Sequence, residues 1–117
     1  MGMIDKHLDH IFETPNAVMR TLAAPSLGSS DLAVWTVEMG AGRTGPLHRA
    51  EHEQVWVVLE GRLAVNDTDY RSGETVVIAA GEERRITAPE PFRALVASRG
   101  GGTVTTAEGT RPLPWAT

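Results

Sequence analysis

Glycine and proline divide this sequence into short runs that favour β-strands. Its 117 residues include 12 Gly and 7 Pro, and the runs between them are rich in Val and other β-formers. Alternating or continuous apolar residues bounded by turn residues predict short strands. We expect strands at residues 32–39, 54–59, 62–65, 68–71, 74–79, 84–87 and 92–97. Short strands at this spacing predict an all-β sandwich or barrel with little or no helix.

The length allows one domain, which we assign to residues 1–117. We expect an N-terminal arm or strand over residues 1–25, a barrel core over 30–99 and an extended C-terminal tail over 110–117. Within the arm, residues 7–12 could form one helical turn. Residues 16–23 fit a helix or a strand equally well, because Pro15 and Pro25 bracket them.

Composition excludes several classes of function. The formal net charge is −4 and the 11 Lys and Arg residues are scattered, which argues against a nucleic-acid partner. The chain has no Cys, so disulfides and thiolate chemistry are excluded. Neither a signal peptide nor an apolar stretch long enough for a membrane helix is present. We therefore expect a cytoplasmic protein with no membrane partner.

Residues 42–61 carry the most informative pattern. Gly42, His48, Ala50, Gln54 and Gly61 fall on the spacing G-x5-H-x-H-x3-E-x6-G, which resembles the first motif of the cupin superfamily. The second cupin motif, G-x5-P-x-G-x2-H-x3-N, falls on Gly73, Ala79, Gly81, Arg84 and Ala88. The resemblance implies a double-stranded β-helix, a jelly-roll barrel with its pocket at one end.

The same resemblance implies a degenerate metal site. Metal-binding cupins take ligands at the positions of His48, Ala50, Gln54 and Arg84 in this chain. Alanine has no donor atom, and a protonated guanidinium repels a divalent cation. One imidazole and one amide are too few for tight binding of Zn²⁺, Fe²⁺ or Mn²⁺. We expect no tightly bound metal.

An alternative keeps the metal. His52 has the strand parity of His48, so His48, His52 and Gln54 could hold Fe, Mn, Zn or Ni. The protein would then be a metal-dependent enzyme of the dioxygenase, isomerase or cyclase type. Otherwise His52, flanked by two Glu residues, lies at the barrel rim as a solvated or ion-paired residue.

Arg84 suggests a different use of the same position. A fixed guanidinium can supply the positive charge of a lost metal and bind a carboxylate or phosphate. His48, His52 and Gln54 would then contact a small anionic organic ligand, and Trp56 would form an apolar wall. The structural alternative is that Arg84 pairs with Glu51 or Glu53, or lies at the surface.

The sequence leaves open whether the protein is an enzyme. His48 is the candidate catalytic residue, with Glu51 or Glu53 as its orienting partner. Residues 54, 56 and 58 should face the barrel interior, because side chains two apart on a strand share a face. The opposite set, Val55, Val57 and Leu59, is also apolar and should be covered by the N-terminal segment or by a second copy in a homodimer.

Overall fold

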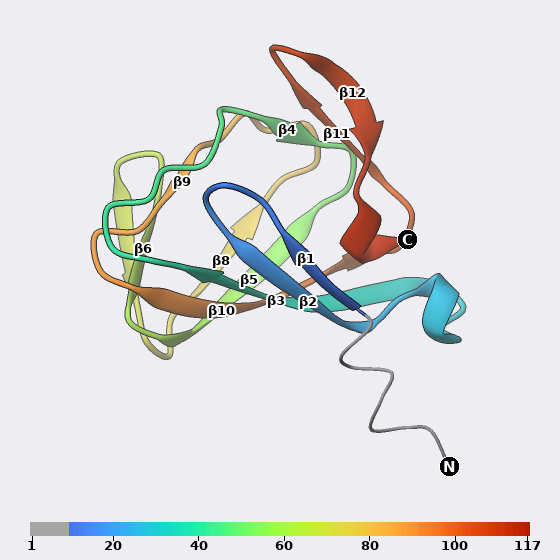
Figure 1. Cartoon of the computed structure of the whole chain (residues 1–117), viewed down its shortest axis with the longest axis horizontal. Coiled ribbons are helices and arrows are strands. Elements are labelled where there is room, and N and C mark those ends of the chain that lie inside the picture. The colour runs from blue at the N-terminus through green and yellow to red at the C-terminus, as the bar shows by residue number, and fades with distance from the viewer. Residues whose placement is uncertain (1–9) are drawn as a thin grey trace.

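The chain folds into a β-barrel with a small sheet at one end (Figure 1). The computed structural model describes residues 10–117. The main sheet has the strand order β1-β2-β3-β10-β5-β8, and two three-stranded sheets have the orders β7-β6-β9 and β12-β11-β4. The strands are β1 (Ile11–Glu13), β2 (Val18–Ala23), β3 (Leu32–Met39), β4 (Arg49–Ala50), β5 (Gln54–Glu60), β6 (Arg62–Val65), β7 (Thr68–Arg71), β8 (Thr75–Ile78), β9 (Ile86–Thr87), β10 (Phe92–Arg99), β11 (Thr103–Thr106) and β12 (Gly109–Pro112).

The all-β prediction is confirmed. Within residues 10–117, helical structure is limited to short 3-10 turns such as η2 (Pro25–Leu27) and η3 (Pro114–Ala116). None of the helical segments in this part of the chain is long and apolar enough to cross a membrane. Of the possible helical turn at residues 7–12, residues 7–9 lie outside the described residues, and Ile11 and Phe12 belong to strand β1. Residues 18–23 form a strand, which decides between the two alternatives for that segment.

The core lies between the sheets and is built from alternating strand residues. β10 lies in the middle of the main sheet and pairs with β3 along eight residues and with β5 on its other side. On β5 the expected inward row is observed, because Gln54, Trp56 and Val58 are all buried. Trp35 on β3 and Val96 on β10 are buried in the same core. The inward row of β5, which carries Gln54 and Trp56, therefore lies next to the central strand of the main sheet.

Two turns show how local sequence fixes the strand order. β6 and β7 have the bounds predicted for the strands at 62–65 and 68–71, and they pair as an antiparallel hairpin. Asn66 between them takes a positive φ of 55°. Gly61, between β5 and β6, has φ 77°, and a Cβ placed there would lie 1.8 Å from the carbonyl oxygen of Pro91. Only glycine fits this close approach without moving the backbone. Gly61 thus allows the chain to pass from the main sheet into the second sheet.

The two ends of the chain differ from expectation. The tail is not simply extended: β12 pairs with β11, and η3 then packs against β1, β2 and β3. Leu113 and Ala116 join the core cluster, and Thr21 Oγ1 donates to the carbonyl oxygen of Trp115 at 2.6 Å. Short polar strands such as 103–106 lack the Val-rich pattern, so the sequence did not indicate them.

The expected cover on the outer face of β5 is absent from the described residues. β1 and β2 extend the main sheet beside β3 and do not lie across its outer face. Val55 and Val57 are half-buried, and Leu59 is 37% exposed. The part of the N-terminal segment that the structure describes therefore does not cover this row, and cover by a second copy stays a prediction.

Candidate functional site

His48 and Arg84 are directly paired where β4 approaches the segment before β9. They form an isolated antiparallel bridge, and each backbone N–H donates to the other residue's carbonyl oxygen at 2.9 Å. Side chains directly opposite each other in an antiparallel pair point to the same face. Arg84 is completely buried and His48 is half-buried. The pairing therefore brings two predicted site residues, distant in sequence, to the same end of the barrel.

The Arg84 guanidinium is held by two hydrogen bonds. Its NH1 group donates to the carbonyl oxygen of Glu82 at 2.8 Å, and its NH2 group donates to Gln54 Oε1 at 2.9 Å. Nε is buried and has no partner in residues 10–117. A buried N–H without an acceptor costs free energy that a bound oxygen atom would recover.

Gln54 links the guanidinium to Trp56. Its Oε1 accepts a second hydrogen bond from the indole Nε1 of Trp56, at 3.0 Å. Both partners are donors only, so they fix which end of the Gln54 amide carries the oxygen. The amide Nε2 then points elsewhere, and it donates to no other group of the described chain. Gln54 therefore keeps N–H donors available for a ligand.

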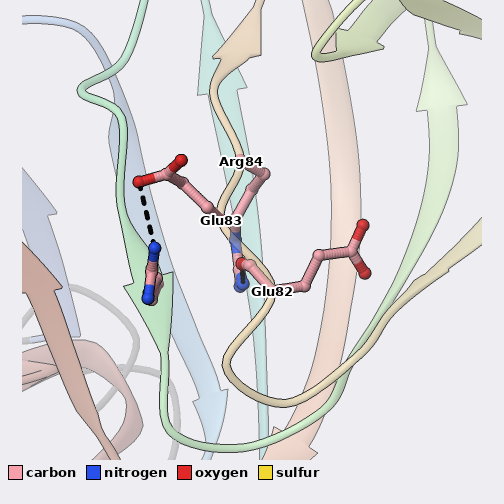
Figure 2. A network of polar contacts seen from close by, with 4 residues as sticks. Glu82, Glu83 and Arg84 are labelled. Atoms are coloured by element: carbon pink, nitrogen blue, oxygen red, sulfur yellow. Dashed lines mark hydrogen bonds and ion pairs between the residues drawn. The ribbon is translucent and has the colours of Figure 1, made fainter.

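The buried cation has no carboxylate partner among residues 10–117. Arg84 forms no ion pair within 4.0 Å in this part of the chain. In Figure 2 the carboxylates of Glu82 and Glu83 point to opposite sides of the strand, and Glu83 pairs with Arg49 at 3.4 Å. Burial lowers the pKa of Arg84, and the charge of Glu82 partly opposes this shift. An arginine nevertheless stays protonated.

His48 is oriented by a backbone carbonyl. Its Nδ1 lies 2.9 Å from the carbonyl oxygen of Pro46, which can only accept, so Nδ1 carries the hydrogen. Burial lowers the pKa of His48, the bond to Pro46 opposes the shift, and the charge of Arg84 lowers it further. His48 also borders a shallow pocket of about 310 Å³ beside Arg49, Glu83 and the β11–β12 hairpin.

The expected partners of His48 and Arg84 are not the observed ones. Glu51 Oε1 accepts hydrogen bonds from the backbone N–H and the hydroxyl of Thr103, at 3.1 and 3.2 Å. Neither Glu51 nor Glu53 forms a hydrogen bond or ion pair with His48 or Arg84 in the described chain, so those alternative roles are wrong. His52 packs against Gly102: a Cβ added there would lie 2.7 Å from the imidazole Cδ2.

Solved structures provide the comparison. No family model and no curated protein matches the sequence. Structural matches include the polyketide cyclase RemF from Streptomyces resistomycificus, with TM-score 0.67 and 22% identity over 73% of this chain and 66% of that one. An RmlC-like cupin from Shewanella frigidimarina matches with TM-score 0.65 and 18% identity, covering 76% and 81% of the two chains. This chain has the fold of the cupin superfamily.

The resemblance seen in the sequence is thus confirmed at the level of the fold. A further cupin-fold match is the DMSP lyase DddQ from Ruegeria pomeroyi, with TM-score 0.64 and 26% identity over 73% of this chain and 47% of the lyase. The present chain spans just under two thirds of the cyclase chain and about half of the lyase chain. At these identities and coverages, cyclase and lyase activity are properties of those two proteins and are not assigned to this chain.

The four metal-ligand positions of the cupin motifs do not fit a metal in this chain. Ala50 is buried without a donor atom, and Arg84 places a cation against Gln54. Gln54 Oε1 already accepts two N–H donors, so it has little capacity left for a metal. Residues 10–117 contain no group of three or more His, Asp or Glu side chains placed to hold a metal ion.

Sequence reasoning missed the backbone groups of this site. The carbonyl oxygens of Pro46 and Glu82 orient His48 and Arg84, respectively. Backbone carbonyls are present in every residue, so no residue type marks them in a sequence. The structure also gives Trp56 a polar contact, since its indole N–H holds Gln54, beyond the apolar wall that the sequence suggested.

Proposed function

We propose that this cupin binds a small anionic organic molecule at the Arg84 end of the barrel, without a tightly bound metal. The observation that carries the proposal is a completely buried guanidinium that has no carboxylate partner in residues 10–117. Removing an ion from water costs several kcal/mol unless a partner compensates for it. A carboxylate or phosphate ligand would provide that compensation.

The polar groups around Arg84 match an anion better than a cation. The unpartnered Nε–H of Arg84 and the Nε2–H groups of Gln54 are donors, and an anionic oxygen is the acceptor they lack. Trp56 and Gln54 hold each other through a buried hydrogen bond, which keeps the donors in place. We further propose that His48 lies beside the ligand, since it shares a face with Arg84.

Access to the site requires movement. Arg84 is 0% exposed, so a ligand that contacts its guanidinium must displace side chains at this end of the barrel. Such opening slows association compared with a preformed cleft. Binding should therefore be measured after long equilibration. We also propose a cytoplasmic location, as the sequence features favour.

Calorimetric titration of the tag-free protein tests the proposal, with benzoate, succinate and inorganic phosphate as probes. We expect binding of at least one anion and a loss of about tenfold or more in affinity in Arg84→Gln. Arg85→Gln is the matched control, because Arg85 is the adjacent, exposed arginine. Elemental analysis of the same sample should find far less than one transition metal per chain.

Three results would contradict the proposal. The first is that none of the three anions binds, and the second is that Arg84→Gln binds them as tightly as the unmodified chain. The third is a stoichiometric transition metal retained through purification, which would favour the metal-dependent enzyme built on His48, His52 and Gln54.

A further inference from the structure

We propose that His48 and Arg84 form a metal-free site for proton transfer at a carbon next to a carbonyl group, and that its substrate is a 2-oxo acid. This inference rests on the proposed anion site and adds chemistry at His48. The geometry behind it is the residue-to-residue pairing of the two side chains, which places a base and a cation on one face of the same bridge.

His48 is prepared to accept a proton. The carbonyl oxygen of Pro46 holds Nδ1–H at 2.9 Å, so in the neutral ring the lone pair lies on Nε2. No group in residues 10–117 hydrogen-bonds to that nitrogen. An imidazole with one nitrogen fixed by a backbone acceptor and the other unengaged is the arrangement of a general base.

Arg84 can stabilise the negative charge that proton removal creates. It is buried, cationic and uncompensated within the described chain, and its Nε–H is directed at no acceptor there. Charge stabilisation by a fixed donor is strongest where water is excluded. Ala50, at the position of the second motif histidine, is buried and carries no imidazole that could compete with His48 as a base.

The substrate class follows from having a single cation. Arg84 must balance the ligand's carboxylate and also the enolate oxygen that forms during the reaction. A guanidinium can bind two oxygens side by side. In a 2-oxo acid the carboxylate and the keto oxygen are on adjacent carbons, so one guanidinium can contact both.

The step is balanced without a co-reactant. His48 Nε2 removes a proton from the carbon beside the keto group, and the C–H electron pair forms the C=C bond of the enolate. The keto oxygen takes the negative charge beside Arg84. While the enolate is held, the proton on Nε2 exchanges with water. Return of this solvent-derived proton from Nε2 to the same carbon regenerates the 2-oxo acid, so the observable result is exchange of that hydrogen with solvent.

Hydrogen–deuterium exchange of pyruvate and phenylpyruvate in D₂O, followed by proton NMR, tests the inference. We expect the protein to accelerate exchange, His48→Gln to lower that acceleration about 100-fold, and Arg85→Gln to leave it unchanged. Calorimetric titration of the same two acids into each variant is run in parallel. We expect Arg85→Gln to bind them as tightly as the unmodified chain, and His48→Gln to lose far more of the exchange rate than of the affinity.

The two measurements separate this inference from the proposed function. If pyruvate or phenylpyruvate binds in an Arg84-dependent way but exchange is not accelerated, or persists in His48→Gln, the proton-transfer inference is overturned and anion binding stands. If benzoate, succinate or phosphate binds and neither 2-oxo acid does, the substrate class is wrong. If no anion binds, the proposed function itself fails.

Discussion

His48 and Arg84 face each other across an antiparallel bridge, each donating its backbone N–H to the other's carbonyl oxygen at 2.9 Å. This places an arginine where the second cupin motif has a metal-binding histidine, beside the one imidazole that the first motif retains. The bridge fixes the backbone of both residues. The positive charge at this position therefore comes from the Arg84 side chain, and not from a bound ion.

The first prediction concerns the stability of the site without its charge. In Arg84→Met the buried cation is replaced by an apolar side chain, while Gln54 keeps its hydrogen bond from Trp56. Buried charges are often retained at a cost to stability, so we expect the free energy of unfolding to stay the same or rise by up to about 2 kcal/mol. Urea denaturation measures it. A clear loss of stability would mean that Arg84 serves the fold and not a ligand.

The second prediction uses charge compensation from within the protein. Gln54→Glu has nearly the same shape and places a carboxylate 2.9 Å from the Arg84 guanidinium, where the amide oxygen now lies. The internal carboxylate should compete with any ligand, so we expect benzoate affinity to fall about tenfold or more. Calorimetric titration measures this loss. Unchanged benzoate affinity would show that the ligand does not use the charge of Arg84.

The third prediction is a pH dependence of stability that belongs to His48. Burial and the charge of Arg84 lower the pKa of the folded His48 below its usual 6.5, so the unfolded chain binds a proton at this position before the folded one does. Stability is therefore fully present above pH 6.5 and falls as the pH drops below that value towards the pKa of the folded state.

Unfolding in urea at several pH values between about 4 and 8 measures this dependence. Since other groups also titrate in this range, the test is the difference between the unmodified chain and His48→Gln. That difference should shrink as the pH falls below 6.5. A difference that is constant across the range would contradict the lowered pKa of His48.

The fourth prediction concerns Gly61 and its control, Gly73. Both have positive φ, 77° and 89°, but a Cβ at Gly61 would lie 1.8 Å from Pro91 O whereas at Gly73 it meets nothing within 4 Å. We expect Gly73→Ala to lower the free energy of unfolding by about 1–2 kcal/mol and Gly61→Ala by about 3 kcal/mol or more. Equal losses in urea denaturation would mean that the β5–β6 turn relaxes freely.

The fifth prediction is the oligomeric state. Val55 and Val57 are half-buried, and Leu59 and Val77 are exposed, on the outer face of the main sheet. The sequence offers a homodimer as one way to cover this face, and we keep it as a prediction. Sedimentation velocity should then give twice the 12.6 kDa mass of one chain. A sedimentation coefficient that corresponds to a monomer at high protein concentration would contradict the homodimer.

Much of the barrel could be predicted because its signals are local. The strand alternation that buries Gln54 and Trp56 has a period of two residues, and the turn at Asn66 depends on one residue type with ready access to positive φ. The strands at 103–106 and 109–112 could not be predicted in this way. They are polar, and they form because each pairs with another strand and not because of their own composition.

By itself the sequence determined the β-rich fold, the inward row on β5 and the positions where cupin metal ligands are replaced. Only the tertiary structure decided that the Arg84 side chain is buried, that Gln54 thirty residues away receives its N–H, and that the carbonyl oxygen of Pro46 sets the imidazole of His48. The physical reason is that a strand pattern fixes which face a side chain takes. The groups it meets on that face depend on long-range pairing and on backbone atoms that every residue shares.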